Sequence, residues 1–210
     1  EWQFRLDSVQ QLANITLPGS CEEQGFGAKA TVKDSNRLTR DIRYVGKAWY
    51  KKTITIPPNW KGKRLELFLE RCLWESAIWL DGKPFGLRNS LSTPHLYDLG
   101  MVTPGTHTLL ICIDNTIKLP IGEWGFALAD DTQGNWNGII GRLELRATDP
   151  VWIRQVQVFT DHLKISIGNN TGRMQPATIQ NTKVTIAAGG AVIALPFTSA
   201  APAWDEFSPL

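Results

Sequence analysis

Acidic side chains near aromatic residues are the groups in this sequence best suited to chemistry on a sugar. Cleavage of a glycosidic bond uses two carboxyl groups held across the sugar pocket. The candidates are Glu70, Glu75, Glu123, Asp130 and Asp131. Because Arg71 directly follows Glu70, a structural ion pair is the favoured interpretation there. Asp130 and Asp131 lie in a predicted long loop. They are interpreted either as solvated residues at its tip or as residues that bind a ligand. These carboxylates alone do not establish catalysis.

Other catalytic chemistries lack their sequence patterns. The sequence contains no Gly-x-Ser-x-Gly nucleophile motif and no glycine-rich phosphate loop. Its three histidines, His95, His107 and His162, are isolated, and neither His-x-x-x-His nor Cys-x-x-Cys spacing occurs. The sequence therefore predicts no metal site and no cofactor.

Composition argues against two classes of partner. The 22 basic and 20 acidic residues give a net charge of +2, and no long basic run occurs. This balance argues against nucleic-acid binding through phosphate neutralisation. No apolar run approaches the roughly 20 residues that a membrane-spanning helix needs, so we expect no membrane span.

Tryptophan is frequent, with nine in 210 residues. One interpretation is an aromatic platform, because the C–H face of a sugar ring stacks on an indole. The other is that most of these rings fill a β-sandwich core, where a large ring buries much area. We expect about two in three to be structural.

The strands that must position these residues are organised around Lys61 to Gly86. Leu65, Leu67 and Leu69 alternate with polar or aromatic residues, which predicts a strand with one buried face. Ser76 to Leu80 is apolar and lacks Gly and Pro, which predicts a strand buried on both faces. Asp81-Gly82 is typical of the turn that ends it.

Alternating or apolar runs predict further strands throughout the chain, and none shows helical periodicity over three turns. Trp2 to Leu6 is expected at a sheet edge. The stretch from Cys21 to Asn36 is predicted to be a surface loop. Ile117 to Asn137 is long, glycine-rich and aromatic, which is typical of functional loops. Further strands are predicted at Asn14–Leu17, Lys51–Ile56, His95–Leu99, Thr108–Ile113, Ile139–Leu145 and His162–Ile167.

The chain is therefore predicted to be all-β, with a domain boundary near Asp149-Pro150. The first domain is expected over 1–148. The second, over 149–210, contains a predicted hairpin in which Lys183–Ala187 and Ala191–Phe197 flank Gly189-Gly190. Its roughly 60 residues are few for a sandwich that usually has ~100, so we expect it to be truncated. Cys72 and Cys112 are expected to be buried thiols, and a disulfide is not indicated.

Several motifs in order resemble the N-terminal sugar-binding domain of glycoside hydrolase family 2. Each is weak alone, but their order and spacing over residues 2–147 are specific. They are Leu17-Pro18-Gly19, Tyr44-x-Gly46-x-Ala48-Trp49-Tyr50, Leu67-x-Leu69-Glu70-Arg71, Trp79-Leu80-Asp81-Gly82, Pro94-His95-x-Tyr97-Asp98-Leu99, Ile113-Asp114-Asn115 and Asn135-Trp136-Asn137-Gly138-Ile139. The end of the chain, Trp204 to Leu210, resembles a late segment of that family's second domain.

The resemblance implies a jelly-roll β-sandwich followed by part of an immunoglobulin-like sandwich. The family's catalytic glutamates lie in a TIM barrel that this chain lacks, so the chain alone is expected to be inactive, with no catalytic residue of its own. Its implied partners are carbohydrate and that missing barrel, whose substrate pocket the jelly roll would line. The implied pocket residues are Asp131 first and Asp130 second, then Trp136, Asn135, Asn137, Tyr44 and Arg43.

The resemblance therefore implies a non-catalytic portion of a retaining exo-β-glycosidase, nearest to β-galactosidases and β-glucuronidase-like enzymes of gut bacteria. A periplasmic or extracellular location follows from the family's habit of acting on external or imported glycans. The alternative is a freestanding carbohydrate-binding or structural β-sandwich module. The sequence does not name the sugar.

Overall fold

The computed structural model describes residues 1–9, 11–31, 40–119, 122, 125, 135–198 and 207. Its described elements are β-strands and one short 3-10 turn, η1 (Pro58–Trp60), which confirms the predicted all-β class. The chain divides into two compact units. The first comprises residues 1–61 and 65–147, and the second comprises residues 62–64 and 148–210.

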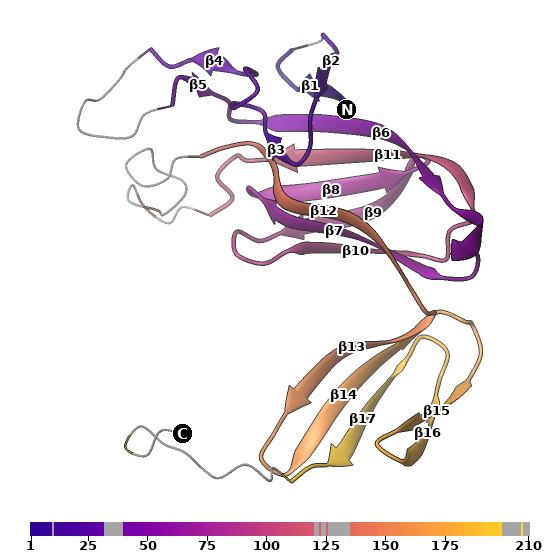
Figure 1. Ribbon diagram of the computed structural model, residues 1–210. Helices are drawn as coiled ribbons and strands as arrows, with labels where there is room; N and C mark the ends of the chain where they lie inside the picture. The colour runs from indigo at the N-terminus through magenta and orange to yellow at the C-terminus, as the bar shows by residue number, and fades with distance from the viewer. Residues whose placement is uncertain are drawn as a thin grey trace. The chain divides into compact units, whose positions relative to one another are not determined.

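Two antiparallel sheets form the sandwich of the first unit (Figure 1). The six-stranded sheet has the order β2 (Ala13–Ile15), β1 (Trp2–Leu6), β6 (Lys47–Ile56), β11 (Gly105–Asp114), β8 (Glu75–Leu80) and β9 (Lys83–Asn89). The four-stranded sheet has the order β10 (His95–Gly100), β7 (Arg64–Cys72), β12 (Gly138–Thr148) and β3 (Gly19–Ser20). A short ribbon pairs β4 (Ala28–Lys29) with β5 (Ile42–Arg43).

Strand alternation builds one core between the two sheets. Leu65, Leu67 and Leu69 of β7 are buried in it, as predicted, and Tyr50 and Ile111 enter it from the opposite sheet. Because successive side chains point to opposite faces of a strand, one apolar face per strand is enough to close the sandwich.

Two predictions about single strands are wrong. Residues 2–6 were expected at an edge, but β1 pairs with both β2 and β6 and lies inside the sheet. The run Ser76–Leu80 was expected to be buried on both faces. Instead Ser76, Ile78 and Leu80 are buried, whereas Ala77 and Trp79 are half-exposed. Because both faces of this strand are mainly apolar, the sequence did not show which set of alternate side chains would be buried in the core.

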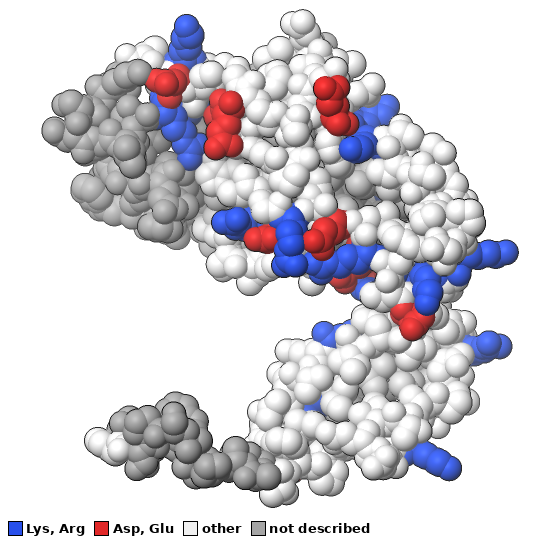
Figure 2. All heavy atoms as spheres, in the orientation of Figure 1, with Lys and Arg blue, Asp and Glu red and all other residues white. Residues whose placement is uncertain are grey.

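Ion pairs cover the outer face of the four-stranded sheet. Phe68 is only 5% exposed because the guanidinium groups of Arg146 and Arg142 lie 3.6 and 4.9 Å from its ring centre. Glu70 accepts a hydrogen bond from Arg142 Nε at 2.9 Å, so its predicted structural role is confirmed. Figure 2 shows acidic and basic side chains alternating in a band on this unit.

The second unit has its own small core. A three-stranded sheet has the order β13 (Val151–Val158), β14 (His162–Asn169) and β17 (Ala191–Pro196), and a ribbon pairs β15 (Gln175–Ile179) with β16 (Thr182–Ile186). Leu163, Ile165 and Ile167 pack against Ile186 and Leu195 between them.

The predicted hairpin around Gly189-Gly190 is wrong. β16 pairs with β15, and β17 pairs with β14, so the two strands that flank these glycines lie in different sheets. The turn itself is present, since the Gly190 N–H donates to the Ala187 carbonyl oxygen, but it carries the chain from one sheet to the other.

All three cysteines are buried, free thiols. The predicted burial of Cys72 and Cys112 is confirmed, and burial raises the pKa of the Cys112 thiol to about 12. Because the thiolate is the reactive form, these side chains behave as small apolar groups.

A buried polar cluster links the two sheets. Ser76 of β8 contacts His95 Nδ1 at 2.6 Å and the Tyr97 hydroxyl at 2.7 Å, both on β10. His95 Nε2 lies 3.0 Å from the Ser90 carbonyl oxygen, which only accepts, so this nitrogen carries the proton and Nδ1 accepts from Ser76. Burial, with a smaller contribution from the nearby Arg88 cation, lowers the pKa of His95 below its usual 6.5.

The first unit should therefore lose stability in mild acid through His95. As the pH falls below 6.5, the unfolded chain binds a proton at this residue before the folded chain does. The slope contributed is at most about 1.4 kcal/mol per pH unit. We expect His95→Gln to flatten the pH dependence of the unfolding free energy, measured by urea denaturation between pH 8 and 5.

His107→Gln is the control of opposite sign. A hydrogen bond to Asp81 raises the pKa of His107, so this residue adds stability below its folded pKa and loses it as the pH rises. Removing it should steepen the loss of stability in acid. Identical slopes for the wild type and His95→Gln would contradict the assignment.

Candidate functional site

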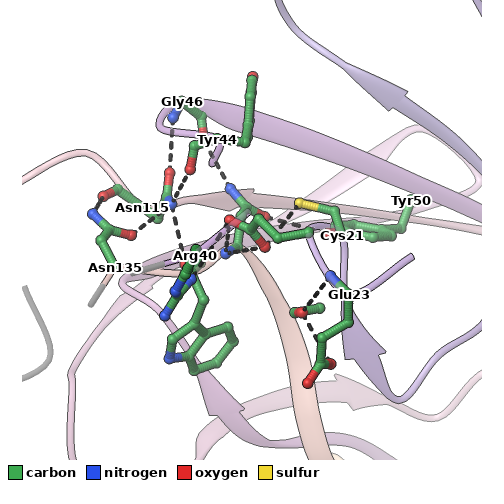
Figure 3. Close-up of polar contacts among 12 residues, drawn as sticks. Cys21, Glu23, Arg40, Tyr44, Gly46, Tyr50, Asn115 and Asn135 are labelled. Atoms are coloured by element: carbon green, nitrogen blue, oxygen red, sulfur yellow. Dashed lines mark hydrogen bonds and ion pairs between the residues drawn. The ribbon is translucent and has the colours of Figure 1, made fainter. Parts of the chain in front are cut away.

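Buried polar side chains gather at one end of the first sandwich. The segments that meet there are residues 20–26, the chain around β5, the start of β6, the end of β11 and the start of β12 (Figure 3). Three of these side chains form what we call the amide network: Asn115, Asn135 and Asn137. All are at most 2% exposed.

Asn115, directly after β11, joins three segments. Its Oδ1 accepts from the Gly46 backbone N–H at 2.7 Å. Its Nδ2 donates to the Tyr44 carbonyl oxygen at 2.8 Å and to Asn135 Oδ1 at 2.6 Å. Asn135 Nδ2 in turn donates to the Asn115 carbonyl oxygen at 2.8 Å. The two amides therefore fix the chain before β6 against the chain before β12.

Asn137 extends the network into the core. Its Nδ2 donates to the Gly46 carbonyl oxygen at 2.8 Å, and its Oδ1 accepts from the Tyr50 hydroxyl at 3.2 Å. The Tyr50 hydroxyl is fully buried, and burial raises its pKa well above the usual value. It therefore acts as a neutral donor.

Glu22 holds the backbone of the same segment. Its Oε1 and Oε2 accept from the Asn137 backbone N–H at 3.0 and 3.1 Å, and Cys21 Sγ donates to Oε2 at 3.3 Å. Arg40 Nη1 lies 4.0 Å from Oε1. Burial raises the pKa of Glu22, while these hydrogen bonds and the Arg40 charge favour the ionised form. Burial and the Glu22 charge raise the pKa of Cys21, so its thiol is unreactive.

Two hollows open beside this polar centre. One, of about 580 Å³, is lined by acidic, basic and aromatic side chains that include Glu22, Arg40, Asp41 and Trp136. The other, of about 660 Å³, is mainly apolar and is lined by residues that include Phe4, Phe26, Arg43, Tyr44 and Val45. Carboxylates and a guanidinium bind hydroxyl groups, and an indole covers an apolar face, so the first hollow suits a polyol.

The structure brings together five of the predicted pocket residues. Asn135, Trp136 and Asn137 directly precede β12, Arg43 is the last residue of β5, and Tyr44 lies between β5 and β6. Trp136 lines the first hollow, and Arg43 and Tyr44 line the second. Asp131 and Asp130, the leading candidates, lie outside the described residues.

The side-chain contacts separate these five by role. Asn135 and Asn137 use their amides within the chain, and the Tyr44 hydroxyl donates to the Lys47 carbonyl oxygen at 2.7 Å. Trp136 and Arg43 are the more exposed of the set. Contact with a ligand stays a prediction for all five, and these two are the better placed.

Sequence analysis missed Glu22 and Arg40. The stretch from Cys21 was predicted to be a surface loop because it is polar and lacks periodicity, yet Cys21 and Glu22 are buried. Glu22 is buried because it accepts from a backbone donor 115 residues away. Two sequence motifs, Ile113-Asp114-Asn115 and Asn135-Trp136-Asn137, marked the asparagines of this network, but neither pointed to Glu22 or Arg40.

Neither a metal centre nor a membrane helix is found in the described part of the chain. Among those residues, His, Cys, Asp and Glu do not gather in groups of three that could hold an ion. No helix there is long and apolar enough to cross a membrane.

Solved structures with a similar fold include three glycosidases. One is a family 2 β-galacturonidase from Eisenbergiella tayi, bound to glycerol. The alignment covers 100% of this chain and 37% of the galacturonidase chain, with a TM-score of 0.66 and 18% sequence identity. A calcium-binding mutant of Bacteroides uniformis β-glucuronidase 2 matches 94% of this chain and 27% of its own, with a TM-score of 0.64 and 18% identity. A β-glucuronidase from an uncultured Clostridium species matches 99% of this chain and 39% of its own, with a TM-score of 0.52 and 17% identity.

These matches show a shared fold. They agree with the predicted β-sandwich architecture, and the chain spans between about a quarter and two-fifths of those proteins' lengths. No protein-family model matches the chain.

Removing Asn115 should weaken the fold more than removing an exposed asparagine. In Asn115→Ala the Gly46 N–H and the Tyr44 carbonyl oxygen lose buried partners, at about 1–3 kcal/mol each. We expect a loss of about 3 kcal/mol in unfolding free energy, measured by urea denaturation. Asn14→Ala, at an exposed position of β2, should change it by less than about 0.5 kcal/mol. Equal effects of the two variants would disprove the structural role of the network.

Proposed function

We propose that this chain is the non-catalytic β-sandwich portion of a family 2 exo-β-glycosidase that removes terminal sugars from glycans. The observation that carries the proposal is the match of the whole chain to 37% of a family 2 galacturonidase. The ordered motifs over residues 2–147 support the same assignment independently of the fold comparison.

In this proposal the end of the first sandwich lines the substrate pocket of a catalytic TIM barrel outside this chain. An exo-acting pocket needs water excluded and hydrogen-bonding groups fixed around one sugar. The amide network supports such a wall, because it leaves the backbone before β6 and β12 little freedom. Beside it Arg43 is exposed and Trp136 is half-buried. In the sequence, Asp131 lies between Asn115 and Asn135, two members of this network.

The finer assignments belong to the same proposal. Residues 1–148 form a jelly roll and residues 149–210 an immunoglobulin-like sandwich. The parent enzyme retains anomeric configuration, acts on β-galactosides or related sugars, and works outside the cytoplasm.

A freestanding carbohydrate-binding module is the second candidate. The polar hollow of about 580 Å³ favours it, since Glu22, Arg40 and Trp136 line it without any other domain. This candidate predicts saturable sugar binding at that hollow by the 210-residue chain alone. The enzyme proposal predicts weak or no binding there, because the other half of the pocket is missing.

The polypeptide encoded by the complete reading frame tests the enzyme proposal. We expect it to hydrolyse an aryl β-galactoside or β-glucuronide, whereas the 210-residue chain should not. In that polypeptide Asp131→Ala should lower kcat/KM by about tenfold or more, through loss of hydrogen bonds to sugar hydroxyls, without changing Tm. Asp161→Ala, at an exposed position of the second unit, is the matched control and should leave kinetics unchanged.

Two results would count against these assignments. Absence of any hydrolysis by the longer polypeptide would remove the enzyme proposal. Unchanged kinetics in Asp131→Ala would remove only the role of Asp131.

A further inference from the structure

Two tryptophans lie on the outer face of the six-stranded sheet. Trp49 of β6, Cys112 of β11 and Ala77 of β8 are cross-strand neighbours and form one row across the sheet. In the adjacent row, Leu110 of β11 pairs with Trp79 of β8. Paired residues share a face, and the alternate residues of these strands enter the core, so both indoles point away from it.

The two rings form one surface. Their centres are 5.7 Å apart and their planes are inclined by 34°. Trp49 Nε1 donates to Asp7 Oδ1 at 3.1 Å, which fixes the orientation of that ring. Both indoles are half-buried, and Leu87 beside them is 49% exposed. We call Trp49, Trp79 and Leu110 the tryptophan platform.

The opposite sheet shows how this protein covers an outward aromatic ring. There Phe68 is covered by two guanidinium groups that are held by glutamates. At the platform no cation–π contact to Trp49 or Trp79 occurs within the described residues. Two indoles in contact with solvent carry a hydrophobic cost that a bound ligand would remove.

Basic side chains border the platform. Arg5 pairs directly with Trp49, and Lys51 pairs with Leu110, so both share the outer face. Lys47 lies one row further along β6. None of the three has an ion-pair partner among the residues that the structure describes. The acidic neighbours on this face are Asp7, Asp114 and Glu75, and each is already engaged. Asp7 accepts from the Trp49 indole, and Lys118 pairs with Asp114 at 2.6 Å and with Glu75 at 3.7 Å. The border therefore favours an anionic group.

The size of the platform selects the kind of ligand. Its three residues lie on three neighbouring strands, β6, β11 and β8, which are about 4.8 Å apart. They occupy two adjacent rows, which are about 7 Å apart along the strand direction. The footprint is therefore roughly 10 by 7 Å, which matches one or two sugar rings. A stable protein interface buries about 800 Å² on each partner, an order of magnitude more.

We propose that the tryptophan platform binds a pyranose ring that carries a carboxylate or a sulfate. The apolar C–H face of the ring packs on Trp49 and Trp79, and its acidic group lies between Arg5 and Lys51. This site is on the face of the sheet, whereas the hollows of the candidate pocket are at its end. It therefore acts independently of any catalytic domain and would anchor an acidic glycan.

Titration of the 210-residue chain tests the proposal. Protein NMR shifts are followed with methyl β-glucuronide, glucose 6-sulfate and neutral methyl β-glucoside at low salt. We expect at least one anionic ligand to bind about tenfold more tightly than the neutral one, a difference of about 1.4 kcal/mol. The advantage should fall as salt is added. Binding of only one anionic ligand identifies carboxylate or sulfate as the group recognised.

Matched variants locate the binding. Trp79→Ala should weaken binding about tenfold, and Lys51→Gln, at an exposed position, should remove the preference for the anionic ligand. Trp136→Phe, in the candidate pocket, should leave binding unchanged. Absence of saturable binding, equal affinity for neutral and anionic sugars, or loss of binding in Trp136→Phe would each overturn the platform assignment. None of these outcomes bears on hydrolysis by the longer polypeptide.

Discussion

The hydrogen bonds from the Asn137 backbone N–H to Glu22 and from the Gly46 N–H to Asn115 are the constraint on which the end of the first sandwich depends. Strand pairing satisfies the backbone inside a sheet, but residues just beyond a strand need other partners when they are buried. A carboxylate and three amides supply them here. Segments far apart in the sequence are therefore fixed to one another at the place where the five described pocket candidates lie.

This network also determines how the candidate site can work. Asn135, Asn137 and the Tyr44 hydroxyl are already hydrogen-bonded within the chain, so their contribution to a pocket is rigidity. Trp136 and Arg43 present their side chains to the two hollows. A preorganised wall costs less conformational entropy when a ligand binds. Under the proposed function, this wall would position a sugar for chemistry supplied by another domain.

The two outer faces of the sandwich differ in a way that matters for binding. Arginine–glutamate pairs cover the aromatic residue on the four-stranded sheet, whereas the six-stranded sheet leaves Trp49 and Trp79 in contact with solvent. Beside them lie Arg5 and Lys51, which have no ion-pair partner among the residues that the structure describes. The same strand alternation produces both faces. What differs is where the paired charges lie: Arg142 and Arg146 lie over the Phe68 ring, whereas Lys118 pairs with Asp114 and Glu75 in the row beyond Trp49 and leaves the indoles uncovered. The proposed ligand would cover them.

The sequence by itself determined the all-β class, the positions of most of the longer strands and the face of β7 that enters the core, because alternation is a local property of a strand. Only the tertiary structure decided that β1 is internal, that β16 and β17 pair elsewhere, and that Trp79 faces outward. It also decided that Glu22 is buried, in a stretch that looks like a surface loop. Each of these depends on a partner far along the chain, and a local pattern carries no information about which distant strand or donor will supply it.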